Sequence, residues 1–334
     1  MRIPGVKTAK TFSRWLQARV LGGAIILGYH RVANVSLDEY DVCITPQHFE
    51  EQMDVVRKFT HPISLSKLVQ HLKVGSLPAK SVAVTFDDGY ADTLYQAKPV
   101  LEKYQIPATV FVCTGYAGKE FWWDELARLV MSSRQDPRAL RLRGGESSFQ
   151  WDQPIVSSDA KSPKDASLRR KFRHSLYHFL LQLDVDERDN AMKMIRGWSA
   201  LSFDKSSNHR AMNCAELLKL AEGGLVDLGA HTVTHPMLPR LAIERQKQEI
   251  ILSKQDLETL LGRQVAGFAY PNGRATDDTR RIVKEAGFAY ACTSLRDVVR
   301  PGGDSYELTR FWQEDVDGDK FMQNLSLWMT MQGN

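Results

Sequence analysis

Short apolar runs alternate with amphipathic stretches along most of the chain. The strand-like runs lie at 24–29, 82–86, 108–113, 226–230, 267–270 and 289–293. Helical periodicity and capping residues occur between them, at 46–59, 64–72, 91–104, 214–222, 241–261 and 276–286. This alternation is typical of an α/β fold built on a mainly parallel sheet.

The alternation is interrupted between about residues 119 and 210. That segment contains Trp122 and Trp123, a serine-rich polar stretch, and a basic helical stretch at 168–195. We expect a helical insertion within one domain that spans 23–334, rather than an independent domain. A lid or substrate groove and additional helical packing are both open as its role.

The first 22 residues form a basic segment that carries four apolar side chains at helical spacing, Phe12, Trp15, Leu16 and Val20. They predict an amphipathic helix on an anionic membrane surface or, alternatively, a helix packed on the body. A secretory signal is not expected, because the charged stretch is long, the apolar run after it is short, and no small-residue cleavage site follows. We therefore expect a cytoplasmic protein, with peripheral attachment at the inner face of the membrane as an option and export as the less favoured alternative.

Composition narrows the class only slightly. The chain has 334 residues, of which 43% are hydrophobic and 25% charged, as in soluble globular proteins. Its net charge of +4 allows an anionic substrate or surface but indicates no nucleic-acid partner. The four cysteines are scattered singly, without the spacing of a disulfide framework or a zinc knuckle.

The strand at 82–86 ends in two adjacent carboxylates, Asp87 and Asp88, followed by Gly89. Two buried carboxylates side by side repel each other and lose hydration unless a cation or a proton lies between them. They can converge only where the strand ends, and Gly89 permits a sharp turn there. The alternative is a pair of acids at the start of the next helix.

A pair of histidines follows the strand at 226–230. His231 and His235 share one face whether the segment is helical or extended, because both periodicities align positions four apart. Two imidazoles and one carboxylate suit a borderline divalent ion and leave positions open for water and substrate. The two strand ends together therefore predict a hydrolytic metal centre.

These motifs resemble those of the polysaccharide deacetylases with NodB homology, carbohydrate esterase family 4. Residues 85–89, Thr-Phe-Asp-Asp-Gly, match the first family motif, and residues 231–235, His-Thr-Val-Thr-His, match the second. The opening residues 28–32 look like the start of the exopolysaccharide deacetylase branch. The resemblance covers about 24–118 and 210–310. It implies a distorted (β/α) barrel of about seven strands and a bacterial exopolysaccharide-modifying hydrolase.

The resemblance also assigns roles. Asp88, His231 and His235 would hold one divalent metal ion, expected to be zinc, with nickel, cobalt, manganese or iron as alternatives. Asp87 would be the general base that takes a proton from water. A backbone N–H in the turn after the strand at 267–270 would stabilise the oxyanion, which makes Tyr270, Pro271 and Asn272 candidate residues.

The chain departs from the family at the third motif. Its usual arginine and tyrosine align with Ala269 and Asn272, so both side-chain functions are missing. Arg310 is a candidate replacement for the arginine that orients the base. An ordinary surface salt bridge is the alternative role of Arg310.

The second departure concerns the acid that protonates the leaving amine. Typical members use a histidine near the carboxyl end, but this sequence has no histidine after His235. His30 ends the first strand and can face the same barrel mouth, so it is the candidate that we expect at the site.

The predicted function is metal-dependent removal of acetyl groups from N-acetylated hexosamines of a polysaccharide or a glycan precursor. Trp122 and Trp123 could stack on sugar rings or anchor the insertion instead. Alternatives are a hydrolase of O-acetyl esters or non-sugar amides, and a catalytically silent glycan-binding or scaffold protein. A carbohydrate substrate is the expected partner, with association with a glycan-assembly complex as an option. The sequence leaves the oligomeric state undetermined.

Overall fold

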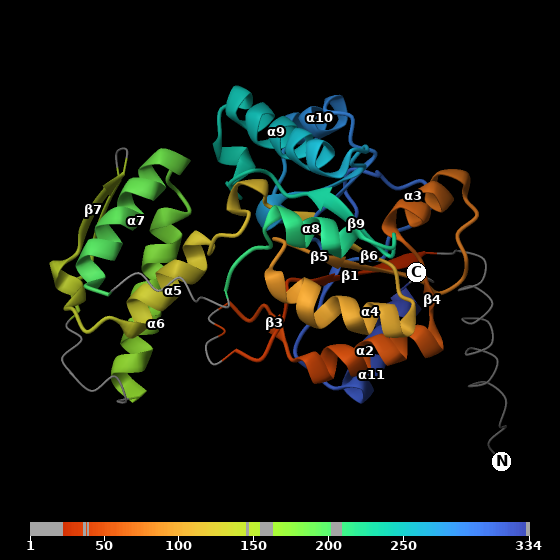
Figure 1. Ribbon diagram of the computed structural model, residues 1–334, viewed down its shortest axis with the longest axis horizontal. Helices are drawn as coiled ribbons and strands as arrows, with labels where there is room; N and C mark the ends of the chain where they lie inside the picture. Colours follow the sequence, from red (N-terminus) through yellow and green to blue (C-terminus); the bar gives the residue numbers. More distant parts are fainter. Residues whose placement is uncertain are drawn as a thin grey trace, which may run out of the picture.

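The computed structural model describes residues 23–35, 38, 40–144, 147–153, 163–201 and 209–331. The basic segment at 1–22, with its expected amphipathic helix, lies outside these residues. Figure 1 shows a large α/β body and a smaller lobe beside it, which is formed by the middle of the chain.

A parallel sheet forms the centre of the body. Its strands are β1 (Ala24–Tyr29), β4 (His61–Pro62), β5 (Ser81–Phe86), β6 (Ala108–Val112), β9 (Val226–Ala230), β10 (Gly267–Ala269), β11 (Tyr290–Cys292) and β12 (Phe311–Trp312). Their order is β11-β10-β9-β6-β5-β1-β12, with β4 added beside β5. Seven strands in this order, curled with helices around them, confirm the predicted distorted (β/α) barrel.

One irregular segment, 305–312, connects the two ends of the sheet. Leu308 exchanges backbone hydrogen bonds with β11, because its N–H donates to Ala291 and its carbonyl accepts from Thr293. A few residues later β12 pairs with β1 in parallel, with Leu27 opposite Phe311. The last strand region therefore reaches the same ring of strand ends as β5 and β9.

Helices cover the outer face of the sheet. They are α2 (Pro46–Phe59), α3 (Leu65–Val74), α4 (Lys98–Tyr104), α8 (Cys214–Ala221), α9 (Ile243–Leu261), α10 (Asp277–Glu285) and α11 (Gly318–Thr330). The helices expected at 46–59, 64–72, 214–222, 241–261 and 276–286 are confirmed. The helix expected at 91–104 is only partly regular, because it begins with a π-helical turn, η1 (Thr93–Ala97), before α4.

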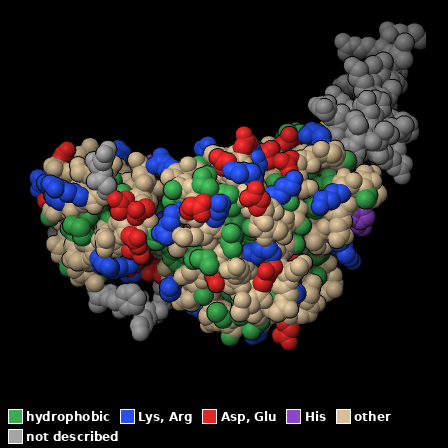
Figure 2. Space-filling model, turned by 90° about the horizontal axis from the view of Figure 1, so that it is seen from above, with side chains coloured by type: hydrophobic (Ala, Val, Ile, Leu, Met, Phe, Trp, Pro, Cys, Tyr) green, Lys and Arg blue, Asp and Glu red, His purple; other side chains and the backbone are tan. Residues whose placement is uncertain are grey.

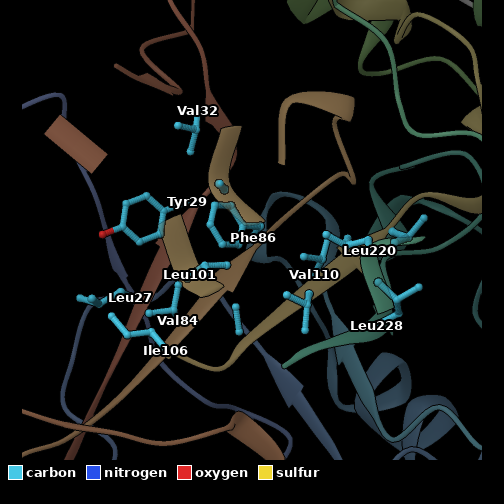
Figure 3. Packing of buried hydrophobic residues seen from close by; sticks show 14 of the residues in the cluster. Leu27, Tyr29, Val32, Val84, Phe86, Leu101, Ile106, Val110, Leu220 and Leu228 are labelled. Carbon is cyan, nitrogen blue, oxygen red and sulfur yellow. The ribbon is translucent and has the colours of Figure 1, made fainter. Parts of the chain in front are cut away.

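Strand alternation divides the apolar side chains into two sets. Outward-facing residues such as Leu27, Val84 and Val110 pack against the helices, in the core that Figure 3 shows. Residues of the other parity, such as Ile26 and Ala83, fill the barrel interior. At the carboxyl ends of the strands, the inward-facing positions are occupied by the polar residues of the barrel mouth.

The segment between about 119 and 210 forms the smaller lobe in Figure 1. It contains α5 (Trp122–Ser132), the hairpin β7 (Arg141–Gly144) and β8 (Ser147–Gln150), α6 (Pro163–Leu180) and α7 (Val185–Ser199). Glu120 and Arg210 pair in an antiparallel bridge where the segment leaves and rejoins the body. The lobe has its own apolar cluster, which includes Phe172 and Leu176 and extends to Tyr90 of the body.

The surface carries charges of both signs. In Figure 2, acidic and basic side chains are interspersed over the visible face rather than gathered by sign. Among the helices that the structure describes, none combines the length and apolar character needed to span a bilayer.

Candidate metal centre and catalytic site

The predicted metal ligands, with Asp87, His30 and Asn272, lie where β1, β5, β9 and β10 end, at one mouth of the barrel, and Arg310 reaches it from just before β12. The backbone there is strained. Four non-glycine residues in these turns have positive φ: Asp88 (69°), Thr232 (67°), His235 (53°) and Asn272 (55°). Such conformations cost roughly 1–3 kcal/mol each and persist where the surrounding structure enforces them, which is common at functional sites. Gly89, with φ of 86°, makes the turn expected after the acid pair.

Oδ1 of Asp88 lies near a ring nitrogen of each of the two histidines, His231 and His235. Nε2 of His231 lies 3.6 Å from Oδ1 of Asp88, and Nε2 of His235 lies 3.7 Å from the same oxygen. These separations are too long for good hydrogen bonds. They are close to the roughly 3.3–3.5 Å expected between neighbouring ligands that are each about 2.0–2.1 Å from a tetrahedral zinc ion.

The protonation preferences of these side chains also fit a cation. Burial, and then the charge of Asp87, raise the pKa of Asp88 well above its ordinary value, while burial lowers the pKa values of His231 and His235. Oδ1 of Asp88 is buried and has no hydrogen-bond partner in the part of the chain that the structure describes. A divalent ion would stabilise the ionised carboxylate and bind the neutral imidazoles, so the residues fit the predicted metal.

Cys113 is a buried neighbour of this cluster. Possible ligand atoms of Asp88, Cys113 and His231 lie within 4.8 Å of one another. However, the Cys113 thiol donates to the carbonyl of His231, and burial raises its pKa well above the ordinary value. This hydrogen bond gives the thiol a role in the turn without a metal, and the histidine pair stays the predicted ligand set.

Hydrogen bonds from three elements hold the histidine turn, the segment 231–235 that carries both histidines. Nδ1 of His231 lies 2.8 Å from the Ala269 carbonyl of β10, which leaves Nε2 for the metal. Glu249 of α9 accepts from the N–H groups of Val233 and Thr234 and from the Thr234 hydroxyl. Arg188 of α7 donates to the Thr234 carbonyl, so the insertion contacts the metal-binding turn directly.

We expect Glu249→Ala to weaken metal binding by about 10–100-fold, because loss of an outer partner lets the ligands move. The two backbone N–H groups would lose their acceptor, and His235 would lose its fixed position. Metal titration of the purified protein measures the effect. Glu244→Ala, at an exposed position on the same helix, is the control. Equal affinities for both variants would contradict the prediction.

Asp87 is held by Arg310 through two hydrogen bonds. Nη1 and Nη2 of Arg310 donate to Oδ1 and Oδ2 of Asp87 at 2.6 and 2.8 Å, and its Nε donates to the Thr293 carbonyl. Arg310 is fully buried, so it is no surface arginine. Burial raises the pKa of Asp87, but the charges of Arg310 and His231 outweigh it and lower that pKa to about 2.

Removal of this arginine should move the acid limb of the pH–rate profile upward. In Arg310→Met, the largest charge that opposes the burial of Asp87 is gone, so the pKa of Asp87 rises and the base becomes protonated at higher pH. We also expect a lower maximal rate, since the carboxylate loses its orientation. Arg310→Lys returns the positive charge, so its acid limb should lie between those of the wild type and Arg310→Met. It cannot restore the two-point contact with the carboxylate. An unchanged acid limb in Arg310→Met would contradict this prediction.

His30 follows β1 and faces the same mouth. Its imidazole stacks on the indole of Trp312, with ring centroids 4.6 Å apart. Burial lowers the pKa of His30 to about 4, opposed by the charge of Asp87. The free imidazole is therefore neutral near pH 7, and it can act as an acid only after it has received a proton.

The three predicted oxyanion residues after β10 differ in the donors that they have available. Within the described residues, neither the N–H nor the Nδ2 of Asn272 donates a hydrogen bond. Pro271 has no N–H to donate and shapes the turn. The prediction for Tyr270 is wrong, because its N–H donates to Cys292 and its hydroxyl to Tyr306, in the outer core.

The two tryptophans of the insertion differ in position. Trp122 is buried and stacked on Tyr177, so it has no free face for a sugar ring and anchors the insertion. Trp123 packs beside His235 with ring centroids 4.9 Å apart, and its indole N–H donates to Tyr90. Trp123 therefore supports a predicted metal ligand rather than forming an open platform.

The sequence alone did not point to Glu249, Arg188 or Trp312. Glu249 and Arg188 lie on helices whose sequences carry no motif, and only the packing brings them to the histidine turn. Trp312 did carry a signal. It lies two residues after Arg310 in a strand, and positions two apart in a strand share a face.

Comparison with known proteins gives consistent matches. The sequence profile of the family described as polysaccharide deacetylase matches residues 75–135 and 196–291. The chain is 22% identical over 319 residues to the poly-beta-1,6-N-acetyl-D-glucosamine N-deacetylase of Staphylococcus aureus strain MRSA252. That match covers 91% of this chain and 82% of the relative.

Two solved structures show the same fold. The Streptococcus pyogenes deacetylase PplD, in complex with acetate, superposes with a TM-score of 0.60 at 19% identity, over 91% of this chain and 99% of that one. IcaB from Ammonifex degensii superposes with a TM-score of 0.58 at 21% identity, over 92% of this chain and 97% of that one.

Proposed function

The chain belongs to the polysaccharide deacetylase family, and from this premise we propose a metal-dependent mechanism with Asp87 as general base. The family activity makes it a carbohydrate N-deacetylase, a hydrolase of carbon–nitrogen bonds other than peptide bonds. The observation that supports the mechanism is the two-point pairing of Asp87 with the buried Arg310, next to the Asp88–His231–His235 cluster.

The two carboxylates have different roles in this mechanism. Asp88 would hold the cation together with His231 and His235, whereas Asp87 faces Arg310 and is available to accept the proton of the attacking water. When bound, a divalent ion there would polarise the amide carbonyl and acidify that water enough for a carboxylate of low pKa to take its proton. Arg310 keeps the carboxylate ionised and oriented throughout.

The oxyanion and the leaving nitrogen need other groups, which lie in the turn after β10 and at the end of β1. The N–H of Asn272 is the donor that we assign to the developing oxyanion. The leaving nitrogen needs a proton, which can come from Asp87 once it is protonated, or through His30. Because His30 is neutral when free, it would relay a proton gained during the reaction rather than supply one of its own.

We further propose that the substrate is a β-linked polymer or oligomer of N-acetylglucosamine. The name of the Staphylococcus aureus relative, which the chain matches along most of both lengths, supports this class. Purified metal-loaded protein should release acetate from such oligomers and leave free amines. Absence of acetate release from the whole panel, with metal bound, would refute the proposal.

The same assay separates the alternatives. An O-acetyl esterase would release acetate from O-acetylated sugars in preference to N-acetylated ones. A silent binding protein would retain the oligomers without releasing acetate. The Asp87–Arg310 pair favours an enzyme, because a buried ion pair beside the metal cluster is costly to retain without a role in the reaction.

We propose a cytoplasmic location, with attachment to the inner face of the membrane or to a glycan-assembly complex. The basic residues at 1–22 support attachment to an anionic surface. Cell fractionation of the full-length protein tests the location. Recovery of a processed, exported form would refute it.

A further inference from the structure

The indole of Trp312 lies at the barrel mouth and has no role in the mechanism above. β12 pairs with β1 in a register that sets Trp312 opposite Gly28. Inward-facing residues recur at every second position, so Arg310 precedes the indole by one step on its own strand, and His30 follows Gly28 by one step on β1. The indole thus lies between the arginine that holds the base and the histidine on the leaving side.

Both neighbours contact this ring. The guanidinium carbon of Arg310 lies 4.5 Å from the indole centroid, which is a cation–π distance. The imidazole of His30 stacks at 4.6 Å with 21° between the ring planes. The stacking contact favours one orientation of the His30 imidazole, and the cation–π contact adds to the pairing that already holds Arg310 on Asp87.

Gly28 provides the space for the indole. A Cβ at this position would lie 2.8 Å from Cε3 and 2.9 Å from Cζ3 of Trp312. Carbon atoms in favourable contact are about 3.5–4.0 Å apart, so a larger residue would displace the ring. The indole can therefore occupy its position only because residue 28 has no side chain.

We propose that Trp312 is a positioning residue for the deacetylation. Its indole fixes the His30 imidazole and the Arg310 guanidinium relative to each other and, through Arg310, the carboxylate of Asp87. The inference rests on the proposed function, because that reaction needs the base and the leaving-side group at a fixed separation. A displacement of about 1 Å in such a group can reduce the rate about 10²-fold.

Kinetics of three variants test this role. Trp312→Leu should lower kcat for acetate release about 100-fold with little change in KM, because the geometry of reaction is lost rather than substrate binding. Trp312→Phe keeps a flat ring and should restore most of the rate. Gly28→Ala retains the indole but displaces it, so it should also lower kcat.

A double-mutant comparison shows whether Gly28→Ala acts on the rate through the indole. Gly28→Ala should have no further effect in the Trp312→Leu background, where there is no indole to displace. If Trp312→Leu does not fold, the loss caused by Gly28→Ala should instead shrink in the Trp312→Phe background, because the smaller ring leaves room for the Cβ. A wild-type kcat in Trp312→Leu, or a Gly28→Ala effect that is equal in every background, would overturn the inference.

An NMR measurement on the metal-free protein is independent of activity. The ring current of a stacked indole shifts the His30 ring protons upfield, and these signals can be assigned by their loss in His30→Gln. They should move downfield in Trp312→Leu and in Gly28→Ala, and unchanged signals would overturn the inference. An inactive wild type would refute the proposed function and the catalytic part of this inference, whereas the NMR comparison would still decide whether Trp312 holds His30.

Discussion

The Asp87→Asn enzyme should bind its metal ion as the wild type does and release acetate about 10²–10⁴-fold more slowly, the usual contribution of a general base. The amide keeps the shape of the carboxylate but cannot accept the proton of water. The ligand cluster of Asp88, His231 and His235 is left complete. Acetate release and metal content, measured on the same preparation, check both parts of the prediction.

The control must account for stability, because Asp87→Asn also leaves the Arg310 charge buried without its partner. Breaking one side of a buried ion pair costs about 3–5 kcal/mol. The ion pair between Arg31 and Asp92 is the control for Asp87–Arg310. Both of its side chains are buried, and Nη2 of Arg31 lies 2.9 Å from Oδ2 of Asp92. Asp92→Asn should therefore lower the melting temperature similarly but reduce the rate far less. Equal rate losses in the two variants would show that Asp87 is only structural.

The His235→Ala protein should lose both its metal and its activity. With one imidazole removed, the cluster retains His231 and Asp88, which gives too few ligands to hold a catalytic ion firmly. We expect the metal affinity to fall by more than the roughly 10–100-fold typical of losing an outer partner. Metal analysis after dialysis and an acetate-release assay measure the two effects.

His174→Ala is the matched control for this change. His174 is an exposed histidine on α6, where its ring contacts His178 and none of the cluster residues. Its replacement should leave metal content and acetate release at wild-type levels. Full metal occupancy in His235→Ala would show that His235 is not a ligand. Full activity of the dialysed, metal-free wild type would refute metal dependence.

The order and type of most elements could be predicted because the signals are local. Apolar runs of strand length, caps such as Ser64 and glycines such as Gly262 mark the bounds of elements within a few residues. The π-helical turn at Thr93–Ala97 could not be predicted, because the sequence there has ordinary helical character.

The candidate metal ligands were also visible in the sequence, because each lies directly after a strand. Strand ends of a parallel barrel meet at one mouth, so Asp88 and the histidine pair were expected to lie together. Tyr270 also follows a strand, yet its side chain lies in the outer core. Alternation sends neighbouring residues to opposite faces, and the sequence does not show which face is the interior at the end of a short strand.

The sequence by itself determined the alternation of strands and helices, the acid pair and the histidine pair, because periodicity and short motifs are properties of neighbouring residues. The barrel was expected from the family resemblance of these motifs. Only the tertiary structure decided which group pairs with Asp87. Arg310 lies 223 residues away from it along the chain and reaches it through the register of β12 on β1. The same register places Trp312 against Gly28 and His30. Contacts of this kind depend on how distant strands align, which no local pattern encodes.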